Sequence, residues 1–325
     1  MAGKKTVLCE MAFWEKFSEC YPASMPFPDE KTQQKIKTWI ELYRFLSRSE
    51  IQLDCSSQSF AIAAQKDPNL AHLWKLSTEG TSKLDFAGSF DALESLLSDH
   101  PFSVLMTASG KGPTAKKYGI ISINGGNCLA KGALFVDNGN AVRIDEKWDW
   151  SQFEKLFPDR SSNSMIIVDN YILKNGKRDL PDLLGLLLPE SCDITYHLTI
   201  FYLAEAGTAV TKDDIVGMIR QAKPGLVENL QLELIPMAAK TDFHDRAIIT
   251  NNLWFFSGGG FDLTRWDPST RSNVVKRSTT LEIVYPYFAT DNIRKVDDAY
   301  ENLIKDARVA LQHARMSSQN RLITG

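Results

Sequence analysis

Apolar side chains recur along the chain at two different spacings, which predict helices and strands in alternation. In residues 33–48 they recur at helical spacing, whereas residues 50–55 and 101–109 are short apolar runs of strand length. Helices are predicted across residues 59–65 and 89–99, and residues 114–125 continue as a short helix and another strand. This alternation predicts a parallel or mixed sheet with helices on its faces.

A second region begins with a nearly continuous apolar run at residues 165–173, which is typical of a buried central strand. Further strands are predicted at residues 196–204, 230–237, 246–251, 253–258 and 279–288. Helices are predicted at residues 180–188, 211–222 and 291–316, with Thr211 as an N-cap. We expect residues 165–173, 196–204 and 246–251 to share one sheet.

The boundary between the two regions is predicted near residue 160. Residues 146–164 contain a short amphipathic helix followed by a cluster of Pro, Asp and Ser, which is typical of a linker. The sequence therefore predicts an α/β protein of two domains. Residues 1–160 form the smaller α/β domain, and residues 161–325 form a mixed sheet flanked by helices.

Composition and charge narrow the classes of function only slightly. The chain has 325 residues, of which 43% are hydrophobic and 24% charged, and its net charge is -3. A surface for nucleic acid or membrane must therefore be a local patch. No run of about 18 apolar residues predicts a membrane span.

The cysteines and the first residues predict a cytoplasmic protein. Residues 1–14 make a poor signal peptide, because their apolar stretch is short and contains Glu10. The five cysteines are widely spaced and never form a CxxC pair, so we expect free thiols in a reducing compartment.

Candidate chemistry is concentrated in residues 243–263, FHDRAIITNNLWFFSGGGFDL. His244 and Arg246 lie two apart, so in a strand they point to the same face. A hairpin can bring the glycines at residues 258–260 back to the same end of the sheet. Small residues let backbone N–H groups approach an anion, and Arg246 offers a planar fork to phosphate oxygens. A histidine beside a phosphoryl group can act as nucleophile or acid, so this stretch predicts a phosphate site.

This spacing resembles that of the phospholipase D superfamily, whose signature is H-x-K, four residues, D, six residues, G-S or G-G, one residue and N. His244 matches the histidine, while Arg246 and Asn251 stand where lysine and aspartate are usual. Gly258 and Gly259 fill the glycine–serine pair, and Phe261 replaces the final asparagine. The pattern is most similar to the degenerate phospholipase-D-like C-terminal domain of microtubule-interacting-and-trafficking domain proteins. The resemblance covers residues 161 to about 316.

The resemblance implies a set of site residues and partners. His244, Arg246 and Glu282, the acid that follows the motif, would be catalytic. The groups implied to bind phosphate are Asn251, Ser257, Gly258, Gly259, Arg271, Lys276 and Arg277. Phospholipase D enzymes combine two motifs, and this chain has one, so catalysis would require a homodimer. The trafficking branch implies binding of phosphoinositide head groups rather than cleavage.

The first half resembles PIN-type nuclease domains, which place several acids at strand ends to hold a divalent metal. Glu10, Asp54 and Asp91 are the acids available for such a site, while Ser109 stands where an aspartate is expected. An active domain of this kind would need a divalent cofactor; otherwise no cofactor or metal is predicted. The structural alternative is that each acid is simply exposed.

The leading functional hypothesis is a nucleic-acid-directed effector, either a weak nuclease (a phosphodiesterase) or a nuclease-derived binder. One alternative is a non-catalytic adaptor for phosphoinositides or other anionic lipids, and another is a partner-binding scaffold with a vestigial site. At the motif itself, the alternatives are a structural histidine, a bulged turn at residues 257–260 and a solvated basic loop.

Overall fold

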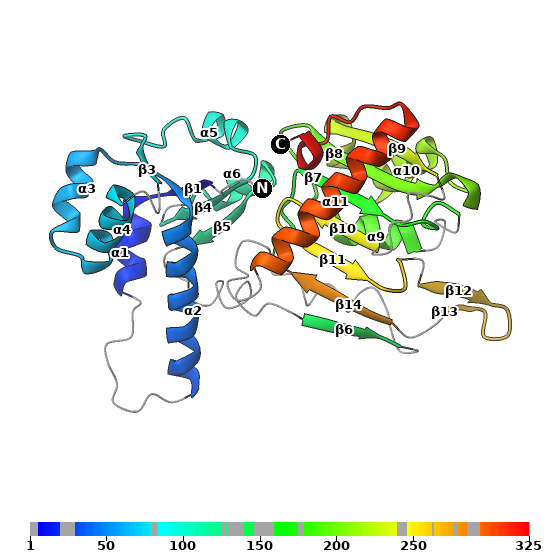
Figure 1. Cartoon of the computed structure of the whole chain (residues 1–325), viewed down its shortest axis with the longest axis horizontal. Helices are drawn as coiled ribbons and strands as arrows, with labels where there is room; N and C mark the ends of the chain where they lie inside the picture. Colours follow the sequence, from blue (N-terminus) through cyan, green and yellow to red (C-terminus); the bar gives the residue numbers. More distant parts are fainter. Residues whose placement is uncertain are drawn as a thin grey trace. The chain divides into compact units, whose positions relative to one another are not determined.

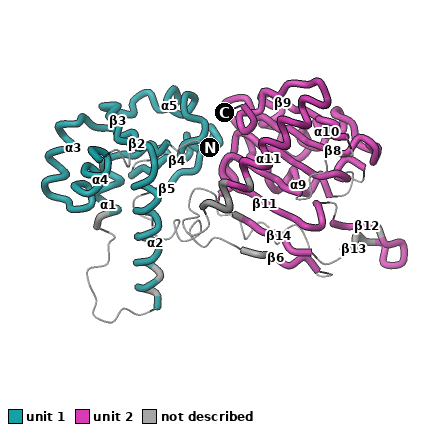
Figure 2. Tube along the Cα trace, viewed as in Figure 1, with its two compact units in different colours: residues 1–138, 287–293 teal, residues 139–286, 294–325 magenta. Residues whose placement is uncertain are grey.

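The computed structural model describes residues 6–19, 30–79, 83–108, 110–124, 128, 140–145, 159–174, 179–238, 246–261, 263–275, 279–284 and 293–324. The chain divides into two compact units (Figure 2). Unit 1 comprises Met1–Asn138 with Tyr287–Ile293, and unit 2 comprises Gly139–Pro286 with Arg294–Gly325. The predicted helix within residues 146–164 falls largely outside the described residues.

Unit 1 is built around a parallel sheet with strand order β3-β2-β1-β4-β5 (Figure 1). Its strands are β1 (Thr6–Cys9), β2 (Glu50–Leu53), β3 (Lys83–Phe86), β4 (Ser103–Thr107) and β5 (Ile121–Asn124). Its described helices are α1 (Met11–Glu19), α2 (Glu30–Arg48), α3 (Ser57–Ala64), α4 (Pro68–Thr78), α5 (Leu93–Asp99) and α6 (Gly112–Lys117). The inner strand β4 is buried along its whole length, whereas the edge strand β3 alternates between half-buried and exposed residues. The alternation of strands and helices predicted from the sequence is confirmed.

Aromatic side chains hold α1 against α2. Phe17 of α1 stacks on Trp39 of α2 with 5.1 Å between ring centroids, and Trp39 stacks on Tyr43 at 5.2 Å. Trp39 also donates a hydrogen bond from Nε1 to the carbonyl of Phe17 at 3.2 Å. The helix α1, which the sequence analysis did not predict, buries Phe13, Trp14 and Phe17 at helical spacing, so its apolar face consists of aromatic side chains.

Unit 2 contains a mixed sheet with strand order β6-β14-β11-β10-β7-β8-β9 (Figure 1). Its strands are β6 (Asn140–Ile144), β7 (Ser164–Val168), β8 (Tyr196–Leu203), β9 (Leu230–Met237), β10 (Arg246–Thr250), β11 (Trp254–Ser257) and β14 (Thr279–Val284). The strands β7, β8 and β9 are parallel, and β10, β11, β14 and β6 continue the sheet in antiparallel pairs. Residues 165–173, 196–204 and 246–251 do contribute to one sheet, as predicted. The strand β6 belongs to the same sheet although it precedes residue 160.

Helices and a separate hairpin complete unit 2. They are α9 (Asp179–Leu187), the 3-10 helices η2 (Ala204–Ala206) and η3 (Pro224–Asn229), α10 (Lys212–Ala222), α11 (Ile293–Ala314), α12 (Arg321–Thr324), and the hairpin of β12 (Thr264–Asp267) and β13 (Ser272–Val275). Thr211 caps α10 as predicted, with a reciprocal contact to Asp214 that forms a capping box. Tyr300 of α11 stacks on Trp254 of β11 at 5.1 Å, so α11 packs on that face of the sheet.

The C-terminal segment is fixed to unit 2 by buried polar contacts. Asn320 is fully buried, and its Nδ2 donates to the carbonyl of Met165 at 2.9 Å and to Oγ1 of Thr199 at 3.0 Å. The next residue, Arg321, donates its backbone N–H to Nδ1 of His197 at 3.2 Å. These contacts connect the end of the chain to β7 and β8, the central parallel strands.

Within the described residues, no helix has the length and apolar character that crossing a membrane requires.

Candidate functional site

The hairpin of β10 and β11 brings Arg246 next to the glycine turn. Arg246 pairs with Ser257 across the two strands, so the turn at residues 258–260 lies at the end of the sheet where β10 begins. Nη1 of Arg246 donates to the carbonyl of Gly258 at 3.1 Å. The predicted return of the turn to this end of the sheet is therefore confirmed for Arg246. His244, Lys276 and Arg277 lie outside the described residues.

One donor of Arg246 is unused by the described residues. Its Nε is buried and makes no hydrogen bond to any residue that the structure describes. A buried, unsatisfied donor on a cationic group costs free energy. An acceptor from outside, such as a phosphate oxygen, would recover that free energy because the guanidinium is a fixed, planar fork.

The turn itself is tightly organised by Ser257. The hydroxyl of Ser257 donates to the carbonyl of Gly260 at 2.7 Å and accepts from the backbone N–H of Gly259 at 3.2 Å. A Cβ at Gly259 would lie 2.9 Å from Oγ1 of Thr279, so the backbone passes close to β14. Ser257 and the N–H of Gly259 thus have partners inside the turn, while Gly258 is exposed with open space around it.

Asp169 is a further residue of this site that the sequence analysis missed. It follows β7 and is buried, and its carboxylate accepts from the N–H of Phe261 at 2.6 Å and of Tyr171 at 2.8 Å. A Cβ at Gly260 would lie 2.7 Å from Oδ2 of Asp169 and 3.5 Å from Cδ of Arg246, so both side chains flank this glycine. The signal was an aspartate directly after the apolar run at residues 165–168, at the carboxyl end where parallel strands carry functional groups.

Asn251 lies at the opposite end of β10 from Arg246. It is fully buried and accepts a hydrogen bond from the backbone N–H of Asn163 at 2.9 Å. The strand β10 is five residues long, and each residue adds about 3.3 Å. The structure therefore does not bring Asn251 to the arginine and the turn.

Glu282 and Arg246 project to opposite faces of the sheet. Arg246 pairs with Ser257, which pairs with Leu281, so these three side chains share one face. Glu282 is the neighbour of Leu281 and pairs with Phe256, and successive residues of a strand alternate between faces. Glu282 is exposed on the other face and does not join Arg246.

Arg271 lies in the turn of the β12–β13 hairpin. It is exposed and has a left-handed backbone with φ of 51°. The base of this hairpin is fixed by Asp179, which accepts from the backbone N–H of Thr264 at 3.0 Å and from its hydroxyl at 2.8 Å.

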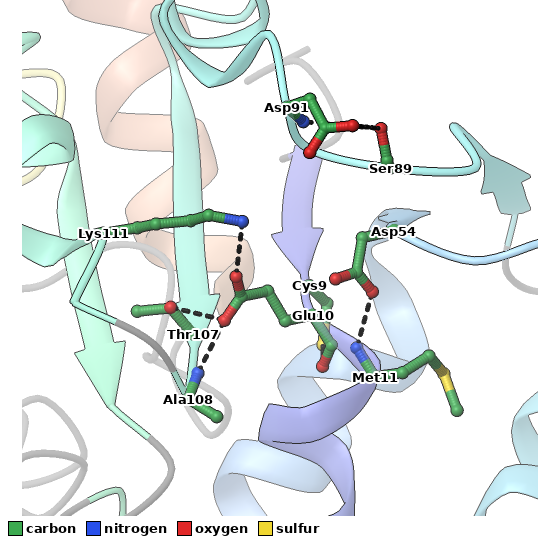
Figure 3. A network of polar contacts seen from close by, with 9 residues as sticks. All are labelled: Cys9, Glu10, Met11, Asp54, Ser89, Asp91, Thr107, Ala108 and Lys111. Carbon is green, nitrogen blue, oxygen red and sulfur yellow. Dashed lines mark hydrogen bonds and ion pairs between the residues drawn. The ribbon is translucent and has the colours of Figure 1, made fainter.

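Unit 1 contains a second polar cluster, at the carboxyl ends of β1 and β4 (Figure 3). Glu10 follows β1 and is 4% exposed. Its Oε2 accepts from the hydroxyl of Thr107 at 2.6 Å and from the N–H of Ala108 at 2.8 Å. Its Oε1 lies 2.8 Å from Nζ of Lys111.

The three acids of the PIN-type hypothesis are not assembled around one point. Asp54 accepts from the backbone N–H of Met11 at 2.7 Å, at the start of α1, and Asp91 accepts from the hydroxyl of Ser89 at 2.8 Å (Figure 3). Ser109 lies outside the described residues. In the part of the chain that the structure describes, no group of three His, Cys, Asp or Glu residues could hold a metal ion.

Three of the described cysteines, Cys9, Cys55 and Cys192, are not activated as nucleophiles. Burial, followed by the nearby Asp54, raises the pKa of the Cys9 thiol, and the same two causes raise the pKa of Cys55 to about 11. Burial also raises the pKa of Cys192 to about 11. Cys9, Cys55, Cys128 and Cys192 are free thiols. At neutral pH a thiol with a raised pKa stays protonated, which makes Cys9, Cys55 and Cys192 poor nucleophiles and metal ligands.

Comparison with known proteins adds no identification. No protein-family model matches the chain, and no curated protein matches it significantly.

Proposed function

We propose that the chain recognises a phosphate or phosphodiester group with Arg246, in a phospholipase-D-like site of unit 2. The observation that carries this proposal is the position of Arg246 at the glycine turn with its buried Nε unpartnered by the described residues. The guanidinium already contacts the carbonyl of Gly258, so its orientation is set before a ligand binds. A cationic group held in place and left with an unused donor is suited to an oxyanion.

We assign the nearby carboxylate of Asp169 a supporting role at this site rather than direct contact with an anion. Both of its oxygens accept hydrogen bonds from backbone N–H groups, which compensates part of its negative charge. Asp169 thereby fixes the segment after the glycine turn. Arg246 then remains the group that meets the phosphate.

The ligand class that we favour is nucleic acid, bound by a nuclease-derived effector. In the trafficking proteins the phospholipase-D-like domain follows a helical domain, whereas unit 1 is a parallel sheet with helices around it. Arg265 and Arg271, which the sequence places in a basic loop beyond the motif, are both exposed and could contact a phosphodiester backbone. This proposal has two forms: the chain either cleaves the nucleic acid with His244 or binds it without cleavage.

Binding measurements on matched variants test the proposal. A short labelled oligonucleotide, DNA or RNA, is titrated with the parent protein, Arg246→Ala, Arg246→Lys and the control Arg220→Ala, which removes an exposed arginine from α10. Arg246→Ala should weaken affinity about tenfold or more, since a charge-assisted hydrogen bond contributes roughly 1.5–3 kcal/mol. Lysine should restore part of the affinity, because it keeps the charge without the fork.

The same titration with phosphoinositide vesicles identifies the ligand class. Arg246-dependent binding to vesicles and none to oligonucleotides would replace the nucleic-acid reading with the lipid adaptor. Equal affinities of the parent and Arg246→Ala for every ligand would refute the phosphate site.

A further inference from the structure

The sheet of unit 1 has a natural binding position between β1 and β4. The strand order is β3-β2-β1-β4-β5, so the direction of the chain across the sheet reverses between these two neighbours. In open α/β sheets, ligands bind beyond the carboxyl ends of the strands at such a reversal. Glu10 follows β1 and Thr107 ends β4, so the polar cluster of Figure 3 occupies this position.

The resemblance to PIN-type nucleases implies a divalent metal here, but the side chains do not fit one. Divalent cations such as Mg²⁺ take several oxygen ligands, usually more than one of them anionic. One oxygen of Asp54 accepts from the N–H of Met11, and one oxygen of Asp91 accepts from the hydroxyl of Ser89. Glu10 instead contacts Thr107, Ala108 and Lys111. The acids expected to share an ion therefore serve separate local contacts.

Lys111 supplies the positive charge that this edge requires. Its ammonium lies 2.8 Å from Oε1 of Glu10, whose side chain is 5% exposed, against 32% for the lysine. On another side the same ammonium lies 5.7 Å from the centroid of the buried Phe90 ring, within the range of a cation–π contact. A buried carboxylate needs a compensating charge and hydrogen bonds, and Glu10 has an ammonium, a hydroxyl and a backbone N–H.

We infer that Lys111 is the built-in cation of this site and takes the role that a divalent metal would take beside Glu10. The negative charge of Glu10 at the carboxyl edge of the unit 1 sheet is then balanced without a metal cofactor. This inference is independent of Arg246 and of the proposed phosphate site, because it concerns contacts within unit 1 alone.

The test uses the full chain and four variants: Lys111→Met, Lys111→Arg, Glu10→Gln and the double variant Glu10→Gln with Lys111→Met. Lys111→Met removes the ammonium that pairs with the buried carboxylate of Glu10 and should lower the Tm by roughly 5–10 °C. Lys111→Arg keeps a positive charge and should lose less. The double variant removes both charges and should be more stable than Lys111→Met alone.

Measurements with Mn²⁺ distinguish a site whose cation is Lys111 from a site that binds a metal ion. The Tm of each protein is measured with and without millimolar Mn²⁺, and bound Mn²⁺ is counted by the loss of the free-ion electron paramagnetic resonance signal. We expect the parent and Glu10→Gln to respond identically. Binding of Mn²⁺ by the parent that Glu10→Gln abolishes would overturn the inference, as would a Lys111→Met protein as stable as the parent. The comparison of the parent with Glu10→Gln still decides the question if Lys111→Met does not fold.

Discussion

The backbone N–H of Arg321 donates to Nδ1 of His197 at 3.2 Å, so this imidazole nitrogen must carry a lone pair in the folded protein. Burial lowers the pKa of His197 to about 4, with a further decrease from the Arg321 guanidinium and an opposing effect of Glu233. Protonation would replace the hydrogen-bond acceptor with a second cation beside Arg321. The docking of the C-terminal segment is therefore coupled to the neutral form of His197.

This coupling predicts a loss of stability in acid. The folded-state pKa of His197 is depressed below its ordinary value of about 6.5, so the unfolded chain binds the proton more readily. The contribution of His197 is fully present above about pH 6.5 and is lost as the pH falls toward about 4. Urea unfolding across this range should show a steeper fall for the parent than for His197→Asn, whose side-chain oxygen can still accept from Arg321. The control His313→Gln changes an exposed histidine and should keep the slope of the parent; equal slopes for the parent and His197→Asn would contradict the prediction.

A second prediction concerns the glycine beside the candidate site. Gly260 has φ of 82°, and an added Cβ would lie 2.7 Å from Oδ2 of the buried Asp169. Alanine there combines left-handed strain of about 1–2 kcal/mol with displacement of a carboxylate that holds two backbone N–H groups. We expect Gly260→Ala to lower the free energy of unfolding by about 3 kcal/mol in urea titrations.

Gly217 provides the matched control for this substitution. It lies inside α10, and nothing within 4 Å obstructs an added Cβ. Gly217→Ala should therefore stabilise the protein by roughly 0.5–1 kcal/mol. A Gly260→Ala protein as stable as Gly217→Ala would show that Asp169 does not confine the turn.

The periodic parts of the fold could be predicted from the sequence, and the parts fixed by tertiary contacts could not. The strand β7 is buried along its length and the helix α10 carries its own cap, so each has a local signal. The strand β6 and the β12–β13 hairpin were missed because they are short and lie outside any strong apolar period. The strand β6 pairs with β14, which lies far away in the sequence, whereas β12 and β13 pair locally with each other.

In the candidate site, too, some features could be predicted from the sequence and others could not. The sequence placed Arg246 at the glycine turn, since the register of a hairpin follows from local spacing. It grouped Asn251 and Glu282 with Arg246 by their match to a motif, but a motif does not state which end of a strand or which face a residue occupies. Nothing in the sequence connected Lys111 with Glu10, because the two residues are about a hundred positions apart.

The third prediction separates the role of Asn251 from that of Arg246. Asn251 accepts from the N–H of Asn163 in a fully buried position, so Asn251→Ala leaves a backbone donor unsatisfied. We expect it to lower the free energy of unfolding by about 1–3 kcal/mol while the affinity for an oligonucleotide is unchanged. Arg246→Ala should show the reverse pattern. Weaker oligonucleotide binding by a fully stable Asn251→Ala protein would show that Asn251 belongs to the phosphate site.

The last prediction concerns turnover. The stretch that resembles the phospholipase D signature occurs once in this chain, and enzymes of that superfamily combine two copies of the signature, so cleavage by the same chemistry would need two chains. We expect phosphodiester turnover, unlike binding, to require a homodimer and His244. Light scattering gives the oligomeric state, and turnover per chain is followed as the protein is diluted toward the monomer. His244→Ala should abolish turnover and leave oligonucleotide affinity unchanged if the histidine is the nucleophile, because only the chemical step is lost.

A protein that stays monomeric and still cleaves would exclude the two-motif mechanism. A dimer that binds through Arg246 without turnover would assign the site to recognition alone, since other residues stand at the positions of the lysine, aspartate and asparagine of the phospholipase D signature.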